Sequence, residues 1–395
     1  MQATHPPIAW GLRASFLCLG LAMGFWGAHV PSAKLLYAID EGTLASALIT
    51  AGLAGILGLS QAGRMVNHLG PPKAACVTGG IMAICLVLTL LTPWLPLLFL
   101  ALAIFGFVAC CFDIAINTMA SELEQQRAQP LMSGFHGVFS IGGMAGAGLV
   151  SAFFAMEMGP LHQMVLAACL VLSLSLWAFQ QTRVWASRLH SSASPRPSLR
   201  DHWRPLAGLG LLIGLGLLTE GAAYDWSVLY VRESLGASES LSVFAFAAFS
   251  GCMAVGRFSG DWLRARLSSR LLLQLSAAIT LTGLGAVVLT EEAWVGIFGY
   301  GVAGLGLANV VPILFSAASR APGPSPAHNI AVVSAIGTAG FMLGPPLVGF
   351  MAEISSLRMG IACTLLGAAL LLVLADRGLG ELTSERLGGP KQGRL

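Results

Sequence analysis

The sequence predicts an all-α integral membrane protein with twelve transmembrane helices in two pseudo-symmetric halves of six. Three observations predict it: an apolar composition, twelve stretches of membrane-spanning length, and basic residues in alternate connections. Of the 395 residues, 56% are hydrophobic and only 10% are charged, whereas soluble domains carry about 25% charged residues. Such a chain cannot cover a water-facing surface, so we expect a lipid bilayer around it.

Twelve stretches are long and apolar enough to cross a membrane as helices. A spanning helix needs about 20 mainly apolar residues. Glycine, of which the chain has 48, is frequent where such helices pack closely. The expected spans are 10–36, 44–62, 74–92, 95–119, 131–155, 161–181, 205–231, 241–260, 270–290, 293–318, 329–352 and 357–375.

The lysine and arginine residues indicate how the spans are oriented. Cytoplasmic connections of membrane proteins carry an excess of both residues. With both termini in the cytoplasm, 18 of the 21 basic residues fall on the inner side, and only Lys34, Arg232 and Arg358 fall outside. An odd error in the count of spans would exchange the sides of every later connection. The asymmetry therefore supports twelve spans with both termini cytoplasmic.

The longest polar stretch divides the spans into two sets of six. It is rich in Ser, Pro and Arg, and we expect a six-helix half at 1–181, a cytoplasmic linker at 182–204 and a second half at 205–395. The eight cysteines lie in apolar stretches without a C-x-x-C pair, which favours packing over disulfides or metal binding. No small-residue cleavage site follows the first apolar run, so we expect no removable signal peptide.

Short motifs recur in the two halves at an offset of nearly half the chain. Duplicated halves around a midplane site are typical of transporters. I-F-G-F at 104–107 recurs as I-F-G-Y at 297–300, G-R-M-V-N-H-L-G at 63–70 corresponds to G-R-F-S-G-D-W-L at 256–263, and Gly142 and Gly146 correspond to Gly340 and Gly344.

Over nearly its whole length the sequence resembles the major facilitator superfamily. The stretch from Gly63 to Lys73 is similar to that family's loop motif between spans 2 and 3, although Asn67 stands where an aspartate is usual; the second copy keeps the acid as Asp261. The resemblance implies a two-half transporter that works by alternating access. It also implies a cytoplasmic gate formed by Arg64, Asn67, Arg257 and Asp261.

A narrower resemblance is to the YbjJ-type group of bacterial inner-membrane proteins, which is distantly similar to fucose permease. Four stretches carry it: 29–34, 113–120, 130–143 and 220–227. The resemblance implies a multi-pass protein of the bacterial inner membrane and leaves the substrate open. Drug/proton antiporters of the superfamily usually carry an arginine in span 4 and a proline after the second glycine of span 5. The chain has no basic residue in span 4 and has Ala147 at the second position.

Ionisable side chains inside the expected spans are candidates for function, because they are costly in a bilayer. In the first half these are His29, Asp113 and His136, with Lys34 at the outer edge. At a rise of about 1.5 Å per residue, Asp113 and His136 lie at similar depths, about 10 and 8 Å from the inner face. They stand on consecutive antiparallel helices, so we expect them to meet and either to share a proton or to form an ion pair. Asn117 adds a polar group on the face of Asp113.

In the second half the candidates are Glu220 and Asp225. Glu220 is expected beyond the midplane of span 7, toward the outside, with Tyr224 one turn further along the same face. His29 lies at a similar depth in span 1. The resemblance to the major facilitator superfamily implies that spans 1 and 7 border a central cavity, so we expect His29 to approach Glu220 or Asp225 across it. A structural role stays open for Asp113, Asn117 and His136, and a place in the interfacial belt stays open for Asp225.

These residues favour a secondary transporter of a small polar solute, with protons as coupling ions. The candidate proton or substrate sites are His29, Asp113, Asn117, His136, Glu220, Tyr224 and Asp225. Two alternatives remain: a drug or metabolite exporter, and a non-transporting sensor or scaffold with the same fold. The sequence contains no phosphate-cradling glycine loop with a lysine and no metal-ligand spacing. We therefore expect no enzyme, no cofactor or metal, no nucleic-acid partner, and a monomer in the bilayer.

Overall fold

The structure is a computed structural model that describes residues 6–127, 131–184, 206–321 and 326–387. In these residues the chain forms helices and no β-strand. Twelve of the helical segments are long and apolar enough to cross a membrane. The predicted all-α membrane fold with twelve spans is confirmed.

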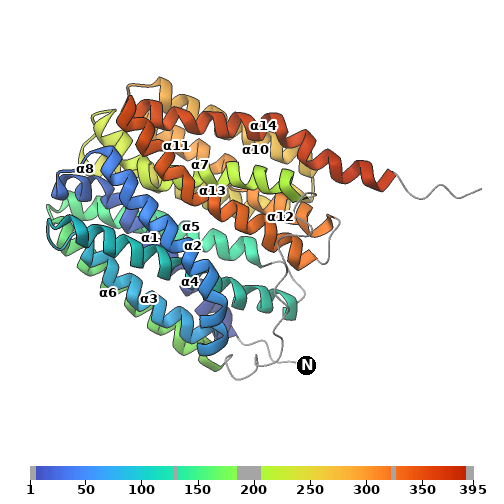
Figure 1. Ribbon diagram of the computed structural model, residues 1–395, viewed down its shortest axis with the longest axis horizontal. Coiled ribbons are helices and arrows are strands. Elements are labelled where there is room, and N and C mark those ends of the chain that lie inside the picture. Colours follow the sequence, from blue (N-terminus) through green and yellow to red (C-terminus); the bar gives the residue numbers. More distant parts are fainter. Residues whose placement is uncertain (1–5, 128–130, 185–205, 322–325, 388–395) are drawn as a thin grey trace, which may run out of the picture.

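The first six spans are single helices that pack together as an N-terminal bundle (Figure 1). Within it, α1 packs against α5 and α6, and α4 packs against α2 and α3. The helices are α1 (Pro6–Tyr37), α2 (Glu41–Leu69), α3 (Pro71–Leu88), α4 (Leu95–Arg127), α5 (Met132–Ala155) and α6 (Pro160–Thr182).

The last six spans form a C-terminal bundle, in which spans 8 and 10 each consist of two helices. Span 8 is made of α8 (Glu239–Ser242) and α9 (Phe244–Arg264), and span 10 of α11 (Ala293–Leu307) and α12 (Val310–Arg320). The others are α7 (Ala207–Glu233), α10 (Ser269–Leu289), α13 (Pro326–Ile354) and α14 (Leu357–Leu387). At the break in span 10, Nδ2 of Asn309 donates to the carbonyl oxygen of Gly256, 3.1 Å away on α9.

Several helices continue beyond the expected spans. α2 runs to Leu69, α4 to Arg127 and α14 to Leu387, where the apolar stretches end at 62, 119 and 375. Helical hydrogen bonding does not stop at the membrane surface, so polar turns continue these helices past the apolar stretches. α2 ends at Gly70, whose φ of 78° suits only glycine, and Gly70 is followed by Pro71.

Glycines bring α1 into backbone contact with α5, and α7 into backbone contact with α13. A Cβ added at Gly142 of α5 would overlap a carbonyl of α1, and one added at Gly20 of α1 would overlap a carbonyl of α5. Gly340 and Gly344 of α13 lie against carbonyls of α7 in the same way. Small residues spaced four apart are typical of closely packed membrane helices. The glycine pairs that the sequence repeat relates thus serve equivalent contacts in the two bundles.

Replacing Gly142 with leucine should destabilise the protein by about 1–3 kcal/mol, because the side chain must push α1 away from α5. Gly148 on the same helix has no atom within 4 Å of an added Cβ, so Gly148→Leu is the matched control. Tryptophan fluorescence during thermal unfolding in detergent measures both variants. Equal unfolding midpoints would contradict the close packing of α1 and α5.

The two bundles meet mainly along the helix pairs α5–α9, α2–α13 and α1–α7. Two hydrogen bonds between α1 and α7 join residues 199 positions apart, Trp26 with Asp225 and Lys34 with Glu233. This separation is close to the offset of the sequence repeat. Equivalent positions of the first helix in each bundle therefore face each other across the interface.

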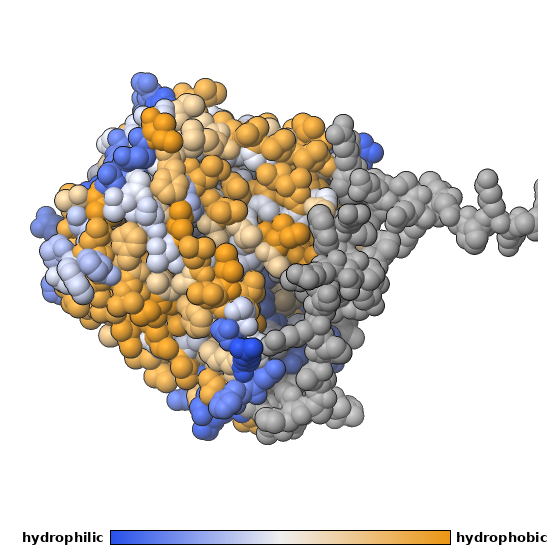
Figure 2. Space-filling view, in the orientation of Figure 1, coloured by the Kyte–Doolittle hydropathy of each residue, from blue (hydrophilic) through white to orange (hydrophobic). Residues whose placement is uncertain are grey.

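Apolar side chains cover the middle of the face shown in Figure 2, and hydrophilic side chains gather at its left and lower right ends. This is the distribution expected for a protein crossing a bilayer. Following the charge-based orientation, we call the end that holds Tyr37 and Glu233 the outer end, and the end that holds Thr182 and Arg264 the inner end. Most of the expected linker at 182–204 lies outside the described residues.

The charge-based orientation predicts which positions an impermeant reagent reaches. Glu291 is exposed between α10 and α11, at the outer end, and Ser192 belongs to the expected cytoplasmic linker. A cysteine at Glu291 should therefore react with an impermeant maleimide added to intact cells, and a cysteine at Ser192 only after the cells are opened. The reverse pattern would invert the topology.

Candidate functional site

A buried ion pair joins α7 and α9 in the C-terminal bundle. Nη2 of Arg257 lies 3.0 Å from Oε1 of Glu220, and the two side chains are 9% and 6% exposed. Glu220 is thirteen residues from either end of α7, so it lies at the middle of this span rather than toward the outside as expected. Removing either partner would leave a buried charge without compensation.

Arg257 also reaches the N-terminal bundle. Its Nη1 donates to Oγ of Ser140 at 2.7 Å and to the carbonyl oxygen of His136 at 3.3 Å, both on α5. The guanidinium group therefore holds a carboxylate of one bundle and two oxygen atoms of the other. A change in the charge of Glu220 acts directly on a contact between the bundles.

Aromatic rings surround Tyr224, one helical turn after Glu220. Its ring centroid lies 4.9–6.2 Å from those of Phe139, Phe246, Phe249 and Phe341. The hydroxyl groups of Tyr224 and Ser250 are both buried, lie within reach of each other and bond to no third group. At least one hydroxyl donor beside the ion pair is therefore left without an acceptor.

The expected pair of Asp113 and His136 does not form. Asn117 donates from Nδ2 to Oδ1 of Asp113 at 2.8 Å, and the His136 ring packs edge-on against Phe16 with centroids 5.4 Å apart. No hydrogen bond or ion pair among the described residues joins Asp113 to His136. The reason is that α4 packs mainly against α2 and α3, whereas α5 packs against α1 and α9.

His29 does not approach Glu220 or Asp225 either. Its side chain is fully buried, with Nδ1 3.3 Å from Oγ of Ser32 and the ring packed edge-on against Phe154 of α5. His29 therefore faces the interior of the N-terminal bundle. Asp225 instead accepts a hydrogen bond of 2.9 Å from Nε1 of Trp26, which links α7 to α1.

Polar contacts close the outer end between the bundles. Nζ of Lys34 on α1 lies 2.9 Å from Glu41 of α2 and 2.6 Å from Glu233 of α7. The backbone N–H of Gly42 donates to Glu353 of α13 at 3.1 Å. Beside Lys34 lies a recess of about 280 Å³ lined by Pro31, Lys34, Leu35, Ala38, Ile39, Arg232 and Glu233.

Replacing Lys34 with glutamine should favour the state that is open to the outside. Of the two ion pairs, only that with Glu233 joins the bundles. A partly exposed pair contributes about 0–1 kcal/mol, so losing it raises the outward-open population up to about fivefold. Spin labels on cysteines at Met156 and Glu291, exposed positions at the outer ends of the two bundles, report the opening. The variant should show a larger share of long distances than the parent, and an unchanged distribution would exclude a gating role for Lys34.

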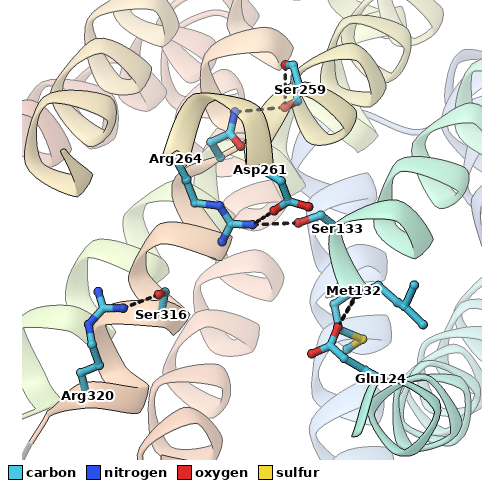
Figure 3. Close-up of polar contacts among 11 residues, drawn as sticks. Glu124, Met132, Ser133, Ser259, Asp261, Arg264, Ser316 and Arg320 are labelled. Atoms are coloured by element: carbon cyan, nitrogen blue, oxygen red, sulfur yellow. Dashed lines mark hydrogen bonds and ion pairs between the residues drawn. The ribbon is translucent and has the colours of Figure 1, made fainter. Parts of the chain in front are cut away.

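No hydrogen bond or ion pair among the described residues joins the two loop copies at the inner end. Arg64 donates to Gln61 on its own helix, and Asp261 pairs with Arg264 three residues further along. Arg264 also donates to Oγ of Ser133 on α5 at 3.3 Å, as Figure 3 shows. Asn67 is exposed, and Arg257 lies deeper, with Glu220. The expectation that Arg257 lies at the inner mouth is therefore wrong, because Arg257 is buried beside Glu220.

At the inner end, the hydrogen bond from Arg264 to Ser133 joins the two bundles. The ends of α3 and α6 lie apart from those of α12 and α14 on the side where the N-terminus is marked (Figure 1). Gly63 of α2 has no atom within 4 Å of an added Cβ. Near the same end, Glu124 of α4 accepts hydrogen bonds from the backbone N–H groups of Leu131 and Met132 (Figure 3) and so caps α5.

Comparison with known proteins identifies the family to which the chain belongs. The sequence profile described as Major Facilitator Superfamily matches residues 15–330. The chain belongs to the major facilitator superfamily. It is 30% identical over 376 residues to an uncharacterized MFS-type transporter of Yersinia pestis, covering 95% of this chain and 96% of that protein. It is 26% identical over 367 residues to the membrane protein MosC of Rhizobium meliloti, covering 91% and 85%.

Solved structures of major facilitator transporters share the fold. The nucleoside transporter NupG superposes with a TM-score of 0.72 at 14% identity, covering 95% of this chain and 98% of that chain. A bacterial homologue of the lysosomal transporter Spinster, in an inward-facing and unoccupied conformation, superposes with a TM-score of 0.68 at 13% identity, covering 97% and 99%. The family consists of transporters rather than enzymes.

In this major facilitator protein, sequence reasoning selected Glu220 and Asp225 but missed the partners that hold them. These partners are Arg257 and Trp26, with Ser140 as the link to α5. One signal was present in the sequence, because Arg257 falls inside the expected span 241–260. The rule that selected the buried acids applies to a buried arginine as well. The resemblance of 256–263 to a cytoplasmic loop motif outweighed it.

Proposed function

We propose that the protein is a secondary active transporter that moves a small polar solute across the bacterial inner membrane by alternating access, coupled to protons. The observation that carries the proposal is the buried Glu220–Arg257 pair, which bonds to α5 of the other bundle. The bacterial major facilitator relatives and the motifs that resemble the YbjJ-type group support the proposed location.

The ion pair supplies a physical route for coupling. A carboxylate in the middle of a span is stable when a cation lies beside it or when it takes up a proton. Protonation of Glu220 removes the ion pair and leaves Arg257 to its oxygen partners on α5. The proton therefore changes the forces between the bundles, which is what a coupled rearrangement requires.

The contacts at the two ends support alternating access. Lys34, Trp26 and Gly42 bond to the C-terminal bundle on the outer side, and no hydrogen bond or ion pair among the described residues joins the inner loop copies. In the opposite state the outer contacts open, and the inner copies, with Arg64, Asn67 and Asp261, come together as a gate. Asp113 with Asn117, half-buried on α4, is the proposed second polar position of the pathway.

Transport by the purified protein in proteoliposomes tests the proposal. Vesicles with an imposed pH gradient are incubated with a panel of small polar metabolites, and the contents are measured by mass spectrometry. We expect at least one solute to accumulate with the gradient and to equilibrate when the gradient is collapsed. Depletion from preloaded vesicles would indicate an exporter. Movement of no solute in either direction would favour a sensor or scaffold.

A further inference from the structure

We infer that the transported solute carries a carboxylate, and that this carboxylate binds Arg257 in place of Glu220. The inference rests on the proposed function, since it names the substrate class of the same site. It starts from the fact that the guanidinium group is permanently charged. Protonation neutralises Glu220 and cannot neutralise Arg257.

A guanidinium group left without an anion at this depth is strongly disfavoured. The hydroxyl of Ser140 and the carbonyl of His136 accept two of its hydrogen bonds but carry no charge. The protonated state therefore needs a replacement anion. A carboxylate matches the planar, forked geometry of the guanidinium group and can accept two parallel hydrogen bonds from it.

Two hydroxyl groups next to the pair have no partner other than each other. Tyr224 is 3% exposed and Ser250 is fully buried, and neither hydroxyl bonds to a third group. The Tyr224 hydroxyl lies close to Glu220 and Arg257 and within reach of the Ser250 hydroxyl. A hydrogen bond between the two hydroxyls uses one donor and leaves the other free, and a buried donor without an acceptor needs an explanation. As donors, the two hydroxyls suit the oxygen atoms of an incoming carboxylate that Arg257 leaves unbound.

Aromatic rings from both bundles border these groups. The rings of Phe139 on α5 and Phe341 on α13 both pack on Tyr224. Tyr224 is almost fully buried, whereas Phe139 and Phe341 are only half-buried. This aromatic border suits the apolar part of a small organic acid.

The other charged groups and histidines with described side chains on the helices around Glu220 are held elsewhere and cannot replace its charge. On α1, α5, α7, α9, α13 and α14 they are Arg13 over Trp10, His29 beside Ser32, Lys34 with Glu41 and Glu233, His136 against Phe16, Asp225 with Trp26, Arg232 with Glu239, Arg264 with Asp261, Glu353 with Gly42, and Arg358 near Tyr230 at the outer end. Among the described residues, Arg257 is thus the cation that loses its counter-ion when the Glu220 carboxylate is protonated.

Charge balance then links the proton to the solute. One proton on Glu220 and one monocarboxylate on Arg257 enter together, and the buried site keeps the same net charge. A neutral solute would leave the guanidinium group uncompensated. The site therefore selects a monoanion together with a proton.

Acetate and acetamide, which differ in charge and little in shape, test the inference by equilibrium binding. Glu220→Ala removes the internal carboxylate and makes room for a small external one at Arg257. We expect acetate to raise the thermal unfolding midpoint of this variant by several degrees in a concentration-dependent way, and acetamide to have no such effect. In Glu220→Ala/Arg257→Gln the difference between acetate and acetamide should disappear.

Equal responses to acetate and acetamide in Glu220→Ala, or an acetate effect that survives in the double variant, would overturn the inference. If Glu220→Ala does not fold, Glu220→Gln replaces it with the same expected order of responses.

The parent should respond to acetate more strongly at acid pH than at neutral pH, and a response independent of pH would contradict displacement of Glu220. Because binding is measured without flux, acetate binding by a protein that transports nothing would reject the proposed function alone. Coupled transport without anion binding would reject this inference alone.

Discussion

Glu220→Gln should abolish accumulation of solute against its gradient. Glutamine keeps the size and the hydrogen bonding of the side chain but cannot take up and release a proton. We expect the variant to fold and to reach the membrane, to lose gradient-driven accumulation in proteoliposomes, and to retain exchange of solute between the two sides. The assay covers about pH 5.5 to 8, so that titrations near neutrality are included.

Glu239→Gln is the matched control for this experiment. Glu239 is exposed at the outer end and pairs with Arg232 at 2.6 Å, so the same substitution there should leave accumulation unchanged. If Glu220→Gln accumulates solute like the parent over the whole pH range, Glu220 is a structural residue and the proton site lies elsewhere.

Arg257→Gln should destabilise the protein by about 3–5 kcal/mol at neutral pH, because the substitution leaves the Glu220 carboxylate buried without a cation. Arg257 also bonds to Ser140, so part of the loss falls on the contact between the bundles. Acid pH should reduce the loss, since protonation removes the uncompensated charge. Denaturant unfolding in detergent, followed by tryptophan fluorescence, measures the effect.

The double variant Glu220→Gln/Arg257→Gln separates the charge from the packing. It should regain most of the stability that Arg257→Gln loses, because neither buried charge remains. Arg232→Gln removes the cation of an exposed pair and should change stability by about 1 kcal/mol or less. If Arg257→Gln and Arg232→Gln have the same free energy of unfolding, water reaches the Glu220 carboxylate and the pair is not desolvated.

The fold was predictable from the sequence because the bilayer imposes simple constraints on length, hydropathy and charge. Twelve apolar stretches and the distribution of basic residues led to the twelve spans. The glycine pair at 142 and 146 and its repeat at 340 and 344 identified positions that the structure uses for close helix contacts. The ends of the helices were less predictable, because polar turns of α2 and α4 continue past the apolar stretches. α2 ends only at Gly70, which precedes Pro71.

The partners within the site were largely unpredictable, and the reason is geometrical. Residue counting estimates depth along a helix and says nothing of which helix stands opposite. Asp113 and His136 share a depth and consecutive helices, yet α4 and α5 pack mainly against different neighbours. Trp26 and Asp225 form a hydrogen bond across 199 positions, which only the pairing of α1 with α7 brings about.

Proton uptake on solute binding tests the central claim, the link between Glu220 and coupling, most directly. The solute that accumulates in the proteoliposome assay is added to purified protein in weakly buffered detergent solution, and an indicator dye follows the pH. The parent should take up about one proton for each solute bound, and Glu220→Gln should bind the solute without taking up a proton. Binding by the parent with no proton uptake, or equal uptake by Glu220→Gln, would contradict the account.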